Sequence, residues 1–164
     1  MDKHYLTPLF APESIVVFAG GRDDEPGRTS LGRTVREALC AQRYGGTLQF
    51  VDIHTSGTLA DLAQAHADLA IIALPSPDVA AALEVAGRMT CRAALVVSSG
   101  IDAEHAAELK RIAKREGMHL LGPNSLGFQR PQAQLNASAA GPLAKAGSLA
   151  LVAQSGAQIG RAHV

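Results

Sequence analysis

The sequence predicts an α/β protein built on a Rossmann-like, doubly wound parallel sheet. Short apolar runs, several rich in β-branched residues, alternate with longer amphipathic stretches, and the connections between them are short. Strands that alternate with helices in this way form a parallel sheet with helices on both faces. At 164 residues, the chain has the length of one ordinary domain with a real core.

The first half of the chain begins with a clear strand and helix. Residues 14–19 form an apolar, β-branched run between a proline and a Gly-Gly pair, which indicates a buried strand. Apolar residues at helical spacing predict a helix over residues 31–43, ended by a second Gly-Gly pair. Residues 47–52 are the second strand, and a short helix is expected over residues 59–67.

The second half continues the alternation. Residues 69–74 predict a strand closed by proline, and residues 76–89 a helix with a proline in its first turn. Residues 93–97 are a fourth strand. Residues 102–117 predict a helix with a basic last turn and a glycine stop, and residues 118–121 a short fifth strand.

After the fifth strand the composition changes. Proline, glycine, alanine and serine replace the periodic pattern over residues 129–145, which favours a linker or an extended connection. Residues 148–153 then read S-L-A-L-V-A and predict another strand, followed by a glycine turn.

The composition excludes several classes of protein. Lys and Arg number 15 against 15 Asp and Glu, so the net charge is zero, and no basic excess exists for nucleic acid or an anionic membrane. The longest apolar run, residues 69–74, is far shorter than the ~20 residues of a membrane helix. Cys40 and Cys91 lie far apart and the six histidines are scattered, so we expect no metal site and a soluble protein of the reducing cytoplasm.

The candidate ligand-binding residues follow the strands, because ligands of such sheets bind outside the carboxyl ends of the strands. After the first strand come two glycines and then G-R-T-S-L-G ahead of a helix, which suits a phosphate site or an ordinary glycine turn with an N-cap. The fingerprints G-x-G-x-x-G and G-x-x-x-x-G-K-[ST] are both missing. The candidates are Gly20, Gly21, Arg22, Arg28, Thr29, Ser30, Leu31, Gly32, Pro75, Val97, Ser98, Ser99, Gly100, Pro123, Asn124 and Ser125.

Several of these positions allow two interpretations. Asp52 ends the second strand, where it could bind the ribose of NAD or simply face solvent in a turn. Pro75 offers an apolar surface to an adenine ring or shapes the turn. Ser155 lies in A-Q-S-G-A, which lacks the first glycine of a nucleophile elbow, and we assign no catalytic residue.

Six stretches carry a resemblance to one family. They are residues 9–17, 30–33, 68–75, 121–127, 135–138 and 149–156. The pair G-P-N-S-L-G and A-Q-S-G, in this order and at this distance, is the most specific part. The chain, over about residues 7–157, resembles the CoA-binding domain of succinyl-CoA synthetase alpha subunits and ADP-forming acetate (acyl)-CoA ligases. The same domain is fused to acetyltransferase modules in bifunctional bacterial acetyltransferases.

The resemblance implies a role for each strand end. Residues 28–32 match the family's phosphate-cradling turn for CoA, and Pro75 falls where an apolar residue flanks adenine. Residues 97–99 match the segment that lines the pantetheine and adenine side. Asn124 and Ser125 lie where the family places the thiol end of CoA.

The sequence departs from the family at several places, which include A-G-G at the first strand end where G-A-S is usual and the acidic residues 23–25 after it. After the second strand, V-D-I-H-T stands where V-N-P and a basic residue are usual, so Asp52 would repel a phosphate placed nearby. The resemblance also implies a later phosphohistidine domain and an ATP-grasp domain or subunit as partner. We therefore expect a CoA-binding domain over residues 7–140 and, over residues 147–164, the first strand and turn of a truncated second, ligase-type domain.

Three functional hypotheses follow. The first is a domain that binds CoA or acyl-CoA, the N-terminal part of an NDP-forming acyl-CoA ligase or fused protein acetyltransferase, catalytically incomplete alone. The second, motivated by Asp52, is an NAD(P)-binding Rossmann domain or redox sensor. The third is a regulatory remnant that binds no nucleotide. The oligomeric state stays open in all three.

Overall fold

The computed structural model describes residues 4–20, 30–53 and 66–154. Four of the candidate site residues, Gly21, Arg22, Arg28 and Thr29, lie outside this range. The same holds for most of the helix expected over residues 59–67 and for the end of the chain after residue 154.

A parallel sheet of five strands forms the centre of the molecule, in the order β2-β1-β3-β4-β5. The strands are β1 (Ser14–Ala19), β2 (Thr47–Val51), β3 (Leu69–Ala73), β4 (Ala93–Val96) and β5 (His119–Leu121). The strand order reverses direction between β1 and β3, as it does in doubly wound sheets. The predicted fold class is confirmed, and each predicted strand up to residue 121 forms.

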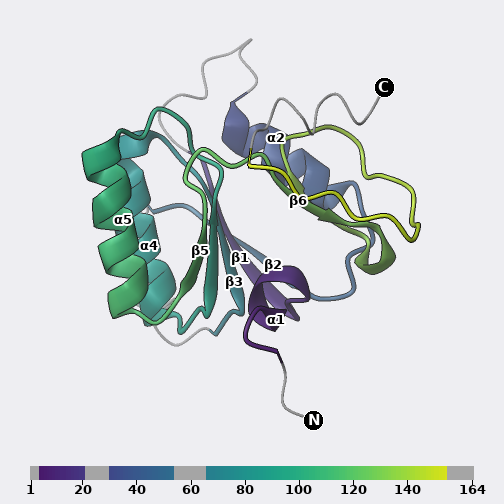
Figure 1. Cartoon of the computed structure of the whole chain (residues 1–164), viewed down its shortest axis with the longest axis horizontal. Helices are drawn as coiled ribbons and strands as arrows, with labels where there is room; N and C mark the ends of the chain where they lie inside the picture. The colour runs from purple at the N-terminus through teal and green to yellow at the C-terminus, as the bar shows by residue number, and fades with distance from the viewer. Residues whose placement is uncertain (1–3, 21–29, 54–65, 155–164) are drawn as a thin grey trace.

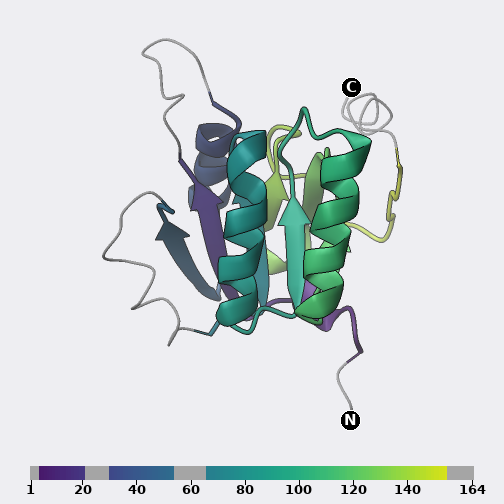
Figure 2. The same cartoon turned by 90° about the vertical axis from the view of Figure 1, so that its left-hand side faces the viewer.

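Helices cover both faces of the sheet (Figures 1 and 2). One face carries α4 (Val79–Arg88), which follows the short 3₁₀ turn η1 (Ser76–Asp78), and α5 (Ala103–Arg115). The other face carries α2 (Leu31–Cys40), and the single turn α1 (Thr7–Phe10) lies near the amino ends of the strands.

The core is divided into two clusters by the sheet. Val16 and Phe18 are fully buried against the α4 and α5 side, whereas Ile15 and Val17 are buried against the α2 side. This alternation follows from the strand, whose successive side chains point to opposite faces. Since both faces are covered, the sequence of β1 is apolar throughout rather than alternating.

The prediction of a linker over residues 129–145 is wrong for the first part of this segment, which forms an antiparallel hairpin. Its elements are β6 (Gly127–Arg130), the 3₁₀ turn η2 (Pro131–Ala133) and β7 (Leu135–Ser138). Leu135 and Ala137 are almost completely buried and join the core cluster beneath α2. The hairpin thus shares with α2 the covering of one sheet face (Figure 1).

The strand expected over residues 148–153 does not form either. Leu149, Leu151 and Val152 expose 99%, 61% and 94% of their surface. A strand needs pairing partners and a buried face, and neither sheet in the described part of the chain accepts this segment as a neighbour. No helix among the described residues is long and apolar enough to cross a membrane.

Shortening Leu135 tests whether the hairpin belongs to the core. We expect Leu135→Ala to lower the free energy of unfolding by about 2–5 kcal/mol, because it leaves a cavity beneath α2. Leu149→Ala is the matched control and should change stability by less than about 0.5 kcal/mol. Urea unfolding followed by circular dichroism measures both, and equal stability of the two variants would contradict the packing described above.

Candidate functional site

The topology collects the loops that follow the parallel strands at one edge of the sheet, the carboxyl edge. The helices that follow β1 and β3 cover opposite faces, so their connections separate at the ends of these two neighbouring strands. Ligands of doubly wound sheets bind at this switch point. Gly20 follows β1 here, and Pro75 lies two residues after β3.

The first turn of α2 lies directly against the ends of both strands. A Cβ atom on Gly32 would lie 3.0 Å from the carbonyl oxygen of Ala73 and 3.3 Å from the backbone nitrogen of Gly20. Glycine is therefore what allows the helix to approach β1 and β3 this closely.

The start of α2 is chemically suited to an anion. Ser30 caps the helix, and its hydroxyl accepts a hydrogen bond of 3.2 Å from the backbone N–H of Arg33. Within the described residues, no acceptor takes the N–H groups of Leu31 and Gly32. The first turn also lacks an acidic residue, so the positive end of the helix dipole is not neutralised there.

Ser98 joins the loops after three different strands. Its side chain is fully buried, and its hydroxyl accepts a hydrogen bond of 3.0 Å from the N–H of Leu74. Its carbonyl accepts one of 3.1 Å from the N–H of Asn124. The hydroxyl of Ser98 is thus engaged inside the protein, whereas Ser99 and Gly100 are exposed at the edge.

The loop after β5 packs closely on the end of β4. A side chain on Gly122, whose φ is +101°, would collide with the carbonyl oxygen of Val96. The N–H of Ser125 donates to the same carbonyl over 3.4 Å, and the Ser125 hydroxyl accepts from the N–H of Gly127 over 3.1 Å. Pro123, which follows Gly122 through a cis peptide bond, and Asn124 are thereby placed at the carboxyl edge.

One pair at this edge was missed from the sequence. The hydroxyl of Ser76, just after β3, lies 3.2 Å from Nδ1 of His105 in the first turn of α5. The N–H of His105 donates to the N-capping Asp102 over 2.8 Å. A histidine three residues after an N-cap, at the end of a strand, is the signal that could have identified it.

The structure therefore brings all the described candidates to one edge. The residues at β1 and α2 are Gly20, Ser30, Leu31 and Gly32, and those of the other loops are Pro75, Val97, Ser98, Ser99, Gly100, Pro123, Asn124 and Ser125. Asp52 follows β2 and is exposed at the same edge. No group of three potential metal ligands occurs among the residues that the structure covers.

Comparison with known families decides among the hypotheses. Residues 47–131, just over half of the 164, match the family model described as "CoA binding domain". The chain belongs to this family of CoA-binding domains. Its ligand class is accordingly coenzyme A, and neither the NAD(P) hypothesis nor the regulatory remnant gains support.

Similar proteins point to one group of enzymes. The chain is 29% identical over 170 residues to the alpha subunit of an ADP-forming acetate–CoA ligase I from Pyrococcus furiosus, covering 93% of this chain and 36% of that one. It is 37% identical over 98 residues to an ADP-forming acetate–CoA ligase I from Archaeoglobus fulgidus, covering 56% and 14%. The chain thus spans little more than a third, at most, of these relatives.

Solved structures agree with the fold. A crystal structure from Pyrococcus horikoshii OT3 matches with a TM-score of 0.79 and 28% identity, over 93% of this chain and 37% of that one. A dinucleotide-forming acetyl-coenzyme A synthetase 1 from Ca. Korarchaeum cryptofilum, in complex with phosphate and ADP, matches with a TM-score of 0.68 and 25% identity, over 82% and 30%.

Two neighbouring serines offer a matched test of the loop contacts. Ser98→Ala leaves the buried N–H of Leu74 without its acceptor, so we expect a loss of about 1–3 kcal/mol in the free energy of unfolding. Hydrogen exchange at the Leu74 amide should become faster. Ser99→Ala, at an exposed position, should change neither quantity. Equal behaviour of the two variants would contradict the role of Ser98.

Proposed function

We propose that this domain binds CoA across its carboxyl edge, with the pyrophosphate at the first turn of α2. The observation that carries this proposal is the approach of Gly32 to the ends of β1 and β3. It sets the N–H groups of Leu31 and Gly32, which have no acceptor among the described residues, beside the switch point of the sheet, where they can donate to a bound anion.

The rest of the cofactor follows the same edge in our proposal. Pro75, half-buried after β3, would contact the adenine, and the exposed Ser99 and Gly100 would line the adenine and pantetheine side. Asn124 and Ser125 would lie near the thiol end. The candidates Gly21, Arg22, Arg28 and Thr29, which lie outside the described residues, precede α2 in the chain and would complete the phosphate site.

The charge at Asp52 supports this placement of the phosphates. It is exposed at the end of β2, and its carboxylate would repel a phosphate group in its vicinity. The phosphates would accordingly lie toward the junction of β1 and β3, at α2. Since the net charge of the chain is zero, the attraction must be local to this turn.

We further propose that the domain supplies CoA to a larger enzyme and does not catalyse a reaction by itself. Its curated relatives are named ADP-forming CoA ligases, which supports the CoA-binding part of such a ligase, or of a fused acetyltransferase, with an ATP-grasp domain or subunit as partner. The domain would comprise residues 7–140. Residues 147–164 would begin a second, ligase-type domain, and the exposed Leu149 and Val152 support this division. Both cysteines are free thiols, which supports the reducing cytoplasm as the compartment.

Calorimetric titration with CoA, dephospho-CoA, acetyl-CoA and NADH tests the site. Gly32→Ala adds a Cβ that must push α2 away from β1 and β3, so we expect CoA affinity to fall about tenfold. Gly45→Ala is the matched control, since its Cβ would enter open space. Unfolding curves of both variants separate loss of binding from loss of the fold.

Three results would contradict the proposal. The first is no heat of binding with CoA at millimolar concentration, and the second is tighter binding of NADH than of CoA. The third is equal CoA affinity of the two glycine variants, which would move the phosphates away from α2.

A further inference from the structure

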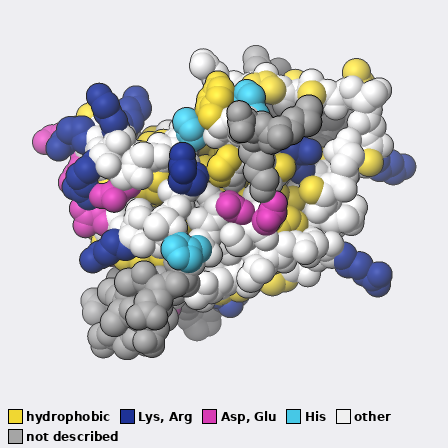
Figure 3. Space-filling view, turned by 90° about the horizontal axis from the view of Figure 1, so that it is seen from below, with side chains coloured by type: hydrophobic (Ala, Val, Ile, Leu, Met, Phe, Trp, Pro, Cys, Tyr) yellow, Lys and Arg dark blue, Asp and Glu magenta, His cyan; other side chains and the backbone are white. Residues whose placement is uncertain are grey.

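A second site lies at the opposite edge of the sheet, at the amino ends of the strands. A pocket of about 210 Å³ opens there between the N-terminal segment and the starts of β1, β3 and β4. Seen from this side, acidic, basic and histidine side chains gather in the centre of the face (Figure 3). The pocket is separate from the carboxyl edge, so its occupant is independent of the CoA site proposed above.

Three charged residues at the pocket are placed by the register of the sheet. Glu13, Asp68 and Arg92 each immediately precede a strand, β1, β3 and β4 respectively. These strands are neighbours, about 4.8 Å apart. The N–H of Arg92 donates to the carbonyl of Asp68 over 3.1 Å, which holds these two residues side by side. Across the edge, the side-chain charges therefore follow the order negative (Glu13), negative (Asp68), positive (Arg92).

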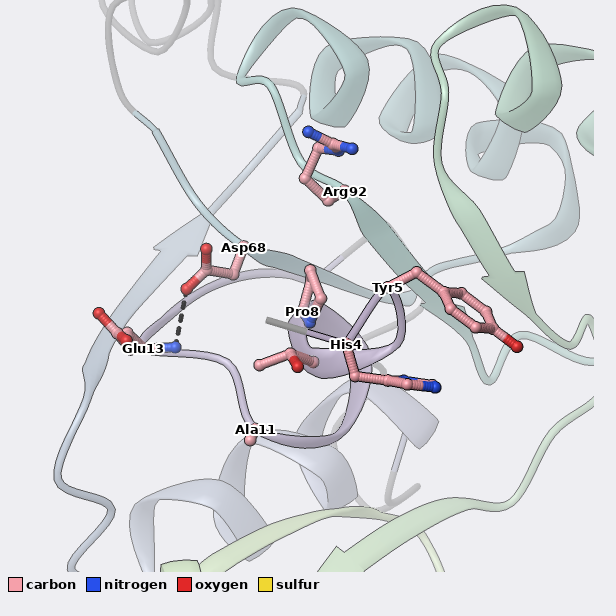
Figure 4. A pocket seen from close by; sticks show the side chains of 8 residues that line it. His4, Tyr5, Pro8, Ala11, Glu13, Asp68 and Arg92 are labelled. Carbon is pink, nitrogen blue, oxygen red and sulfur yellow. Dashed lines mark hydrogen bonds between the residues drawn. The ribbon is translucent and has the colours of Figure 1, made fainter. Parts of the chain in front are cut away.

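The carboxylate of Asp68 is fixed by one of its two oxygens. Oδ2 accepts a hydrogen bond of 2.7 Å from the N–H of Glu13 (Figure 4) and one of 3.1 Å from the N–H of Ser14. Oδ1 accepts none from the described residues. Asp68 thus presents an oriented oxygen that is available to a ligand.

Arg92 has no ion pair within the described part of the chain, although Asp68 is on the next strand. Its side chain is exposed and lines the same pocket. A cation and a carboxylate that flank a pocket without neutralising each other can each bind the opposite charge of one ligand.

The N-terminal segment makes the other side of the pocket. Figure 4 shows Pro8, His4 and Tyr5 across from Glu13 and Asp68, with the rings of His4 and Tyr5 directed away from the two carboxylates. The centroids of these two rings lie 4.4 Å apart. The segment that follows is held to the body of the protein, because Nη1 of Arg130 donates to the carbonyl of Phe10 over 2.6 Å. The turn α1, which carries the pocket residues Thr7 and Pro8, is therefore held in place before a ligand binds.

We propose that this pocket binds a free α-amino acid as its zwitterion. The ammonium group would face Asp68, beside Glu13, the carboxylate would face Arg92, and the side chain would lie along the N-terminal segment at Pro8 and Ala11. The volume of about 210 Å³ is below the ~300–1,000 Å³ of pockets for drug-sized ligands and too small for CoA. A simple carboxylic acid would be repelled by the carboxylate of Asp68, and a simple amine would leave Arg92 without a partner.

Thermal shift followed by calorimetry with the common L-amino acids tests the proposal on the whole chain. Each amino acid is compared with its N-acetyl form, which lacks the ammonium charge, and its amide, which lacks the carboxylate. We expect at least one amino acid to bind at millimolar concentration. The affinity of both of its blocked forms should be lower by a factor of about ten or more.

Two variants locate the site. Asp68→Asn retains an oxygen for the N–H groups of Glu13 and Ser14 and removes the charge at the pocket. Arg92→Gln removes the cation. Each should weaken amino-acid binding about tenfold. Both should leave CoA binding unchanged, and Arg111→Gln, exposed on α5, is the control that should leave both ligands unaffected.

Four results would overturn the proposal. They are no binding of any amino acid at about 10 mM, equal binding of the blocked forms, unchanged affinity in both pocket variants, and a parallel loss of CoA affinity in those variants. Because CoA is measured in every sample, failure of this site is distinguishable from failure of the CoA site.

Discussion

The carboxyl edge of this domain depends on one close contact, that of the first turn of α2 with the backbone ends of β1 and β3. Only a residue without a side chain fits this contact comfortably, because a Cβ on Gly32 would lie 3.0 Å from the carbonyl oxygen of Ala73. The contact determines how closely α2 packs on the sheet. It also brings the helix N-terminus to the switch point, where the positive end of its dipole can act on a bound phosphate.

A second contact gives the rest of the edge its shape. The hydroxyl of the buried Ser98 accepts a hydrogen bond from the N–H of Leu74, and its carbonyl accepts one from the N–H of Asn124. These bonds link the loops after β3, β4 and β5 to each other. A cofactor as long as CoA must contact several loops at once. Loops that are already held in place lose less conformational entropy when it binds.

The sequence was sufficient for the centre of the sheet because the inner strands β1, β3 and β4 are apolar almost throughout. Residues 14–19 and 69–74 are apolar throughout, which is the pattern of strands buried on both faces, and the structure places strands there. The hairpin was not predictable in the same way. Leu135 and Ala137 alternate with Asn136 and Ser138 as in a strand, but the alternation covers only four residues and lies between Pro131 and Gly141, so the turn-forming residues dominated the pattern.

The location of the candidate site was predictable from the sequence, but the roles of its individual side chains were not. The rule that ligands bind at the carboxyl ends of strands identified the edge. Whether Ser98 contacts a ligand or holds loops depends on burial, and whether Ser76 meets His105 depends on how α5 packs. The strand was expected over residues 148–153 because the local sequence is apolar. A strand also needs a neighbouring strand to pair with, and the local sequence carries no information on whether one is present.

The position of CoA at the carboxyl edge can be tested by a crystal structure of this chain with CoA bound. We expect the pyrophosphate within hydrogen-bond distance of the N–H groups of Leu31 and Gly32, with the adenine beside Pro75 and the thiol toward Asn124. Density for CoA over the end of β2 near Asp52, or at the amino edge near Arg92, would contradict it.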